Sequence, residues 1–147
     1  MKLSEIMTRD VAILQPDDSL QFAAKKMRDL NIGFLPVCDG EDLIGVISDR
    51  DIIIRALAEG MDANIMLGRD MMTTPPICCF DDQDVSEAAK IMEENQIRRL
   101  VVLNRTDKRI AGVISLGDLA RNETADRSGK VLQKVSEPDG IEKAKST

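Results

Sequence analysis

Apolar residues recur with helical spacing in two stretches of the chain that lie 65 residues apart. In each stretch they occupy positions i, i+3, i+4 and i+7: Leu20, Ala23, Ala24 and Met27 in the first, and Val85, Ala88, Ala89 and Met92 in the second. This spacing places the four side chains of each set on one face of a helix. The pattern therefore predicts two amphipathic helices, which end near Leu30 and near Asn95.

Shorter apolar runs around each helix predict strands. One run precedes each helix and two follow it: Val11–Leu14, Phe34–Cys38 and Leu43–Ile47 around the first, and Ile77–Phe80, Leu100–Leu103 and Ile110–Ile114 around the second. Asp39-Gly40 is typical of the turn in the first hairpin. The acidic pairs Asp17-Asp18 and Asp81-Asp82 suit the N-terminal caps of the two helices. Further helices are predicted to begin near Asp51 and near Asp118.

The order strand, helix, strand, strand, helix thus occurs twice, and a repeated phrase marks the repeat. Residues 45–52 read GVISDRDI and residues 112–119 read GVISLGDL, while Met7-Thr8 is matched by Met72-Thr73. Two additional residues of the second repeat fall in the turn Asn104–Arg109. We expect repeats at 1–64, with the connecting segment, and at 65–133. A half of about 60 residues buries little core alone. The two halves are therefore expected to pack through their sheets about a pseudo-twofold axis, with a polar, fraying tail at 134–147.

Composition narrows the range of functions. The chain has 147 residues and a net charge of −6, which argues against non-specific binding to nucleic acid. It contains no His, the commonest general base and metal ligand, and its three cysteines have no metal-binding spacing. Cys38, Cys78 and Cys79 are expected to be unlinked thiols, with Cys78 and Cys79 facing opposite sides of a strand. No run is long enough for a membrane helix, and the start Met1–Glu5 does not suit a signal peptide, so a cytoplasmic protein is expected.

Residues 3–122 resemble a tandem pair of CBS domains, the unit called a Bateman module, and are similar to short bacterial stress- and hypoxia-response proteins of this kind. The resemblance rests on the paired phrases, the Met-Thr openings, and the stretches NIGFLPV and NQIRRLVV. It implies an α/β (α+β) fold of two pseudo-twofold-related β-α-β-β-α repeats. It also implies a regulatory function, with an adenosine-containing ligand (AMP, ADP, ATP, NAD or S-adenosylmethionine), a homodimeric assembly and no catalysis by this chain.

The phrase has two physical interpretations. Ser48 with Asp51, and Ser115 with Asp118, lie at junctions of strand and helix, where free N–H groups suit phosphate. Each Asp can accept hydrogen bonds from ribose hydroxyls. The alternative is simple helix capping. For the serines we prefer capping. For the aspartates we prefer ribose binding, on the reasoning that capping does not require the Ser-x-x-Asp spacing.

In the family, a ligand site usually combines the phrase of one repeat with the opening and second strand of the other. The resemblance therefore implies one site made of Ser48, Arg50, Asp51, Thr73, Ile77, Cys78, Ile97, Arg98 and Arg99. It implies a second made of Ser115, Gly117, Asp118, Thr8, Ala12, Ile13, Ile32, Gly33 and Phe34. The first contains three arginines, whose planar forks suit phosphate oxygens. Alternatively, these arginines form salt bridges at the surface or at a dimer interface.

Three functions are considered: a regulatory adenosine-binding module with an unidentified protein target, a ligand-free dimeric scaffold, and an enzyme. The last is disfavoured because no nucleophile–base pair, metal cluster or phosphate-cradling Gly loop is present. A homodimer is expected because several apolar residues exceed what one internal face needs: Ile52, Ile53, Ile54, Leu57 and Leu119.

Overall fold

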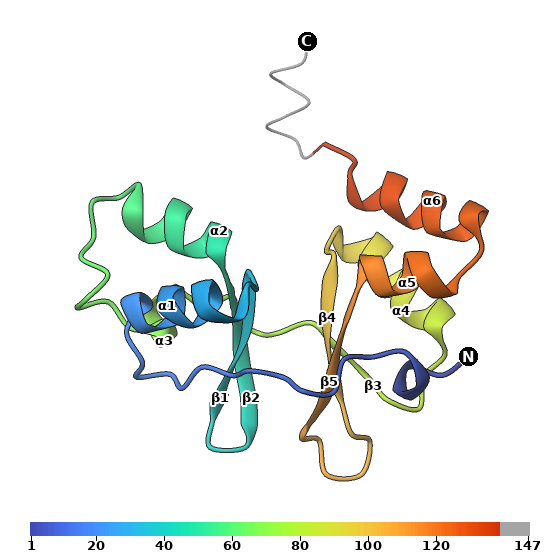
Figure 1. The fold of residues 1–147 in the computed structure, drawn as a ribbon, viewed down its shortest axis with the longest axis horizontal. Coiled ribbons are helices and arrows are strands. Elements are labelled where there is room, and N and C mark those ends of the chain that lie inside the picture. The colour runs from blue at the N-terminus through green and yellow to red at the C-terminus, as the bar shows by residue number, and fades with distance from the viewer. Residues whose placement is uncertain (139–147) are drawn as a thin grey trace. The chain divides into compact units, whose positions relative to one another are not determined.

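The computed structural model describes residues 1–138, which form two compact units (Figure 1). The first-repeat unit contains residues 10–77 and 107–110. The second-repeat unit contains residues 1–9 and 78–106 together with residues from 111 onward. The two units therefore do not coincide with the two halves of the sequence. The opening of the chain belongs with the second repeat, and the opening of the second repeat belongs with the first.

The first-repeat unit contains one hairpin and its helices. Its elements are α1 (Leu20–Leu30), β1 (Phe34–Asp39), β2 (Asp42–Ser48), α2 (Asp49–Asp51), the π-helix η2 (Ile52–Leu57) and α3 (Gly68–Met71). β1 and β2 pair antiparallel, and Asp39 lies opposite Asp42. The turn is therefore Gly40-Glu41, one residue later than predicted, with Gly40 in the left-handed region that glycine tolerates best (φ 63°). The core is formed by Leu14, Leu20, Leu35, Val37 and Ile47 with smaller neighbours.

The predicted strand Val11–Leu14 is reduced to a single parallel bridge between Leu14 and Val37. Leu14 donates its N–H to the carbonyl of Pro36 at 2.9 Å, and Cys38 donates to the carbonyl of Leu14 at 2.9 Å. The next ladder bonds in both directions would come from the nitrogens of Pro36 and Pro16, which carry no hydrogen. The two prolines thus limit this strand to one residue.

The second-repeat unit has a three-stranded sheet in the order β3-β4-β5. Its elements are the 3₁₀ helix η1 (Leu3–Glu5), β3 (Cys78–Phe80), α4 (Val85–Asn95), β4 (Arg99–Leu103), β5 (Ile110–Ser115), α5 (Leu116–Asn122) and α6 (Ala125–Val135). β3 runs parallel to β4. The core contains Leu3, Met92, Leu100 and Ile114 with their neighbours.

The ends of α1 and α4 at Leu30 and Asn95 confirm the prediction, but the predicted caps were wrong. The caps are Ser19, which accepts from the N–H of Phe22 at 3.0 Å, and Asp84, which accepts from that of Ser86 at 2.9 Å. The acidic pairs make other contacts. Asp17 forms an ion pair with Arg69, Asp18 accepts from the N–H of Gln15, Asp81 accepts from the N–H of Arg105, and Asp82 pairs with the Arg105 side chain.

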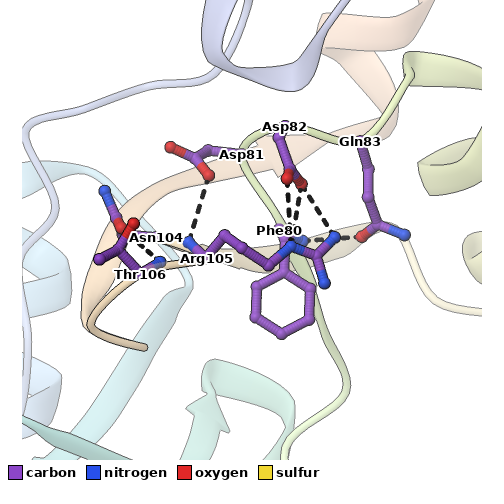
Figure 2. Close-up of polar contacts among 7 residues, drawn as sticks. All are labelled: Phe80, Asp81, Asp82, Gln83, Asn104, Arg105 and Thr106. Atoms are coloured by element: carbon purple, nitrogen blue, oxygen red, sulfur yellow. Dashed lines mark hydrogen bonds and ion pairs between the residues drawn. The ribbon is translucent and has the colours of Figure 1, made fainter.

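The longer turn of the second repeat is fixed by Arg105 (Figure 2). Its guanidinium lies 4.0 Å from the ring centre of Phe80 and donates to both carboxylate oxygens of Asp82, from Nη2 at 2.9 Å and from Nε at 3.1 Å. The hydrogen bonds and charge of Arg105 lower the pKa of Asp82 below its ordinary value. The two additional residues are therefore held against the residues that precede α4.

Helix α6 was not predicted, and it changes two expectations. It packs against α4 and α5 (Figure 1), and its residues Val131 and Val135 are buried in one cluster with Leu119. Leu119 is fully buried, so the prediction that it faces a partner was wrong. Lys134 and Val135 are helical rather than part of a fraying tail. The rest of the predicted tail from residue 139 to 147 lies outside the described residues.

Candidate functional site

Each repeated Ser-x-x-Asp phrase forms a reciprocal cap at the start of a helix. Asp51 donates its backbone N–H to Oγ of Ser48 at 3.1 Å, and Ser48 donates its N–H to Oδ2 of Asp51 at 2.9 Å. Asp118 and Ser115 form the same two bonds, at 3.1 and 2.9 Å. This is the capping box, in which residues three apart satisfy each other's N–H groups. The reasoning that capping does not need this spacing was therefore wrong.

Capping uses only one of the two carboxylate oxygens of each Asp. It uses Oδ2, whereas Oδ1 of Asp51 lies 3.7 Å from Nε of Arg55 and Oδ1 of Asp118 accepts a hydrogen bond from Arg121. The Asp51 side chain is 17% exposed and that of Asp118 is 11% exposed. A carboxylate oxygen can accept two hydrogen bonds. Both aspartates can thus cap a helix and still accept a hydrogen bond from a ligand at Oδ1.

The Met-Thr openings lie against the phrase strands of the opposite repeats. Thr73 and Val46 exchange backbone hydrogen bonds at 2.8 and 3.0 Å, and Thr8 and Val113 do so at 2.9 Å in both directions. Thr73 therefore belongs to the same unit as Ser48, Arg50 and Asp51, and Thr8 belongs to the same unit as Ser115, Gly117 and Asp118. Both threonines are exposed.

The glycine of each phrase makes this close approach possible. A Cβ on Gly45 would lie 2.6 Å from Sδ of Met72 and 3.0 Å from the Thr73 carbonyl oxygen. One on Gly112 would lie 2.7 Å from the Thr8 carbonyl oxygen and 2.8 Å from Sδ of Met7. Sequence reasoning missed this role, although the recurrence of Gly in the phrase together with Met-Thr was the available signal.

Local packing accounts for part of the sequence difference between the two Ser-x-x-Asp phrases. Asp49 donates its N–H to the Gly33 carbonyl at 2.9 Å, and the matching bond in the second repeat joins Leu116 to Arg98 at 2.8 Å. A Cβ on Gly33 would lie 2.6 Å from a carboxylate oxygen of Asp49. Glycine therefore fits beside Asp49 in the first repeat, and the larger Arg98 stands beside Leu116 in the second.

The remaining predicted site residues are distributed over both units. Ile77 belongs to the first-repeat unit, as do Ala12, Ile13, Ile32, Gly33 and Phe34. Cys78, Ile97, Arg98 and Arg99 belong to the second-repeat unit. Each unit thus contains one phrase and the Thr that was assigned to that phrase. It also contains the second-strand residues that were assigned to the phrase of the other unit.

The arginine side chains fall into two groups. Eight donate to a carboxylate or a backbone carbonyl: Arg9, Arg28, Arg55, Arg69, Arg105, Arg109, Arg121 and Arg127. The side chains of Arg50, Arg98 and Arg99 make no such bond with any residue of 1–138, and all three are exposed. The arginines without a partner in the described chain are thus the three that the sequence assigned to a ligand site.

The three cysteines are free thiols, as predicted. Cys79 is buried while Cys78 is partly exposed, which confirms that neighbouring side chains of this strand face opposite sides. Burial raises the pKa of Cys79 to about 12, and burial also raises the pKa values of Cys38 and Cys78. These thiols therefore remain protonated near neutral pH and are poor nucleophiles.

Within residues 1–138, no group of three or more acidic or cysteine side chains is arranged to hold a metal ion. No helix of the same residues has the length and apolar character needed to cross a membrane.

Comparison with known proteins identifies the family. The model of the CBS domain matches residues 3–57 and again residues 68–124. The chain belongs to the CBS domain family. This confirms the tandem CBS pair and its mixed helix and sheet fold. Among relatives, the uncharacterized protein YlbB of Bacillus subtilis is 36% identical over 144 residues, which cover 96% of this chain and 95% of YlbB. Hypoxic response protein 1 of Mycobacterium tuberculosis is 33% identical over 119 residues, which cover 80% of this chain and 82% of that protein.

Solved structures of CBS proteins share the fold. The conserved CBS domain protein TA0289 of Thermoplasma acidophilum superposes with a TM-score of 0.84 at 24% identity, covering 95% of this chain and 78% of TA0289. CBSX2 in complex with AMP has a TM-score of 0.70 at 25% identity, covering 82% and 94% of the two chains. The CBS pair of MJ0100, in complex with 5′-methylthioadenosine and S-adenosyl-L-methionine, has a TM-score of 0.73 at 26% identity, covering 83% and 94%.

Proposed function

We propose that this CBS pair is a regulatory module that binds an adenosine-containing ligand and carries out no chemistry itself. The observation that carries the proposal is an arrangement that occurs twice. In each unit, a Ser-x-x-Asp phrase caps the start of a helix, and the Thr of the Met-Thr opening of the other repeat lies in the same unit. The structures of related CBS pairs with AMP and with S-adenosylmethionine support the ligand class. The module is proposed to act in the cytoplasm as a homodimer that transmits ligand binding to an unidentified protein target.

The residues have distinct proposed roles. Oδ1 of Asp51 and of Asp118 accepts hydrogen bonds from ribose hydroxyls, while Oδ2 keeps the helix capped. Each Ser Oγ accepts a hydrogen bond from the Asp N–H, which leaves its own O–H free to donate to a phosphate oxygen. Arg50 supplies positive charge to the Ser48 site of its own unit, in a chain whose net charge is −6.

The alternative is a dimeric scaffold whose sites stay empty. The two functions differ in whether small molecules bind, so the test begins with mass spectrometry of compounds that co-purify with the protein. Calorimetric titration with AMP, ATP, NAD and S-adenosylmethionine then measures affinity. Binding of at least one compound without its turnover is expected. If none of the four binds, the scaffold is correct; if a bound compound is converted, the protein is an enzyme.

Cap variants separate a ligand contact from a structural effect. Asp51→Ala and Asp118→Ala each remove a cap and a proposed ribose acceptor. Asp70→Ala is the matched control, because Oδ2 of Asp70 accepts the N–H of Leu67 at 3.0 Å at the start of α3, a helix start that has no Ser-x-x-Asp phrase. All three should lose about 1 kcal/mol of stability. Ligand affinity should fall at least tenfold in Asp51→Ala or Asp118→Ala and stay unchanged in Asp70→Ala. Unchanged affinity in the Asp51→Ala, Asp118→Ala double variant would leave both phrases as helix caps only.

A further inference from the structure

An arginine side chain contacts the candidate ribose acceptor of the second repeat. In the second-repeat unit, Nη2 of Arg121 donates a hydrogen bond to Oδ1 of Asp118. This is the oxygen that the helix cap leaves free, because the cap uses Oδ2. A carboxylate oxygen can accept two hydrogen bonds, so Arg121 takes one of the two places on Oδ1. One place on this oxygen is then left for the ribose hydroxyls that the proposed function assigns to it.

The first-repeat unit has no such contact at its own carboxylate. The residue that matches the arginine, 67 positions earlier, is Ile54, whose side chain has no donor. The neighbouring Arg55 is directed elsewhere, since its Nη1 donates to the carbonyl oxygens of Met71 and Met72 at 3.2 and 3.4 Å. Its Nε lies 3.7 Å from Oδ1 of Asp51, which is too long for a hydrogen bond. Within residues 1–138, both places on this oxygen are therefore open to a ligand.

The phrase of the second repeat leaves room for the arginine. A Cβ on Gly117 would lie 3.4 Å from Nη1 of Arg121 and 3.5 Å from Oγ of Ser115. The guanidinium therefore lies beside the phrase, at the place where the side chain of a larger residue 117 would begin. The first repeat has Arg50 at the matching position. Glycine and the contacting arginine thus occur together in one repeat, while Arg50 and Ile54 occur in the other.

The contact joins a nearly buried acceptor to an exposed donor. The Asp118 side chain is 11% exposed, whereas that of Arg121 is 69% exposed. A hydrogen bond between two charged groups is roughly twice as strong as one between neutral groups. A ribose hydroxyl that replaces the guanidinium therefore exchanges a stronger hydrogen bond for a weaker one. The displaced guanidinium remains in water, so the pair can open without burying an unpaired charge.

We propose that Arg121 is a latch that lowers the affinity of the Ser115 site for ribose, whereas the Ser48 site has no latch and fills first. This inference rests on the proposed function and deepens it, because it names a residue that makes the two sites unequal. A ligand at Asp118 must either displace Arg121 or form one ribose hydrogen bond fewer. Removal of this one side chain should therefore strengthen the second site.

Calorimetric titration of the full chain with adenosine tests the latch. Adenosine has the ribose but no charge, so removing a positive charge from the protein does not by itself change its electrostatic attraction. Asp51→Ala removes the ribose acceptor of the first repeat and is the common background, in which the second site is measured alone. Adding Arg121→Met, which keeps a long side chain without a donor, should raise the affinity about fivefold or more, as expected for one regained hydrogen bond.

Arg28→Met in the same background is the matched control. Arg28 also forms an ion pair, with Asp29, and its side chain is 70% exposed. This variant therefore loses the same charge and a similar surface pair, and its affinity for adenosine should not change. Thermal unfolding should show both variants folded, because each substituted side chain is exposed.

The outcomes separate the latch from the proposed function. Unchanged affinity in Arg121→Met, with adenosine still bound, would overturn the latch and keep the binding function. A lower affinity in Arg121→Met would show that the arginine holds the ligand, which also overturns the latch. A gain that persists when Asp118→Ala is added would mean that Arg121 does not act through this carboxylate. If adenosine, AMP, ATP, NAD and S-adenosylmethionine bind to neither the wild type nor Arg121→Met, both the latch and the proposed function are wrong.

Discussion

Asp84, the cap of α4, is an ionisable residue whose contribution to stability depends on pH. Its Oδ2 accepts hydrogen bonds from the Ser86 hydroxyl at 2.5 Å and from the Ser86 N–H at 2.9 Å. These bonds hold the pKa of Asp84 well below its ordinary value of 3.8. The corresponding cap of α1 is Ser19, whose hydroxyl does not titrate in this range. The two repeats thus cap equivalent helices with one ionisable and one neutral side chain.

We predict that Asp84→Asn removes a pH-dependent part of the stability. A carboxylate whose pKa is lowered by folding stabilises the native state above its unfolded pKa, and this contribution is lost as pH falls through the folded pKa. Asparagine also caps helices but does not ionise. The wild type should therefore have the higher thermal midpoint at pH 7, and the difference should shrink below about pH 4. Ser19→Ala, the control, should lower the midpoint equally at every pH. A constant difference between wild type and Asp84→Asn from pH 7 to pH 2 would contradict the prediction.

At the scale of elements, the contact between each Met-Thr opening and its phrase strand depends on glycine. Gly112→Ala would place a Cβ 2.7 Å from the backbone carbonyl oxygen of Thr8, and backbone cannot move aside as a flexible side chain can. We predict a loss of about 1–3 kcal/mol of stability, the usual cost of overpacking.

Gly129→Ala is the matched control. Gly129 lies inside α6 with no atom within 4 Å of an added Cβ, so alanine should stabilise the protein by about 0.5–1 kcal/mol. Urea unfolding of both variants measures the two effects. Equal changes for Gly112→Ala and Gly129→Ala would mean that the Thr8 segment does not need this glycine.

The same elements show where sequence patterns suffice. α1 and α4 were predictable because apolar residues with helical spacing fix one buried face, formed by all four residues in α4 and by all but the exposed Ala24 in α1. α6 was missed because it carries few apolar residues, chiefly Val131, Leu132 and Val135, and contains Gly129. The first strand was overestimated because the effect of Pro16 and Pro36 depends on which residues pair.

For similar reasons, only part of the candidate site could be predicted from the sequence. The junctions at Ser48 and Ser115 follow from the change from strand to helix. Two other features depend on which residues meet in space, which one sequence does not show. They are the closeness of Gly45 to Met72, and the absence of an ion-pair partner for Arg50 among residues 1–138. The use of the Asp51 spacing in capping, by contrast, was available from general principles and was judged wrongly.

At the scale of the whole molecule, duplication has produced two phrases that place charged residues differently, with Asp49-Arg50 in the first where the second has Leu116-Gly117. The family pattern assigns Arg50, Arg98 and Arg99 to the Ser48 phrase, whereas the matching residues for the Ser115 phrase are Gly117, Gly33 and Phe34. The three arginines form no ion pair within residues 1–138, so surface salt bridges within one copy of the chain do not account for them, and the alternative of salt bridges at a dimer interface stays open. Within the described residues, no carboxylate side chain pairs with their charge.

We predict that the Ser48 site prefers di- and triphosphates and that the Ser115 site binds less charged adenosine compounds or stays empty. Arg50→Ala should weaken ATP more than AMP, by about 1–3 kcal/mol, because a charged hydrogen bond is lost. Asp51→Ala should weaken both nucleotides alike, since both contain the ribose. Arg28→Ala, which removes the same charge from a surface pair with Asp29, should change neither affinity.

Fluorescent nucleotide titrations suit this comparison, because the chain contains no Trp or Tyr and gives little background. Asp118→Ala provides the complementary test, since it should leave the tighter triphosphate site intact while removing the weaker one. Equal losses of ATP and AMP affinity in Arg50→Ala would show that the arginine does not select for phosphate charge. A loss of the same size in Arg28→Ala would show that the overall charge of the protein, rather than the position of Arg50, governs the preference.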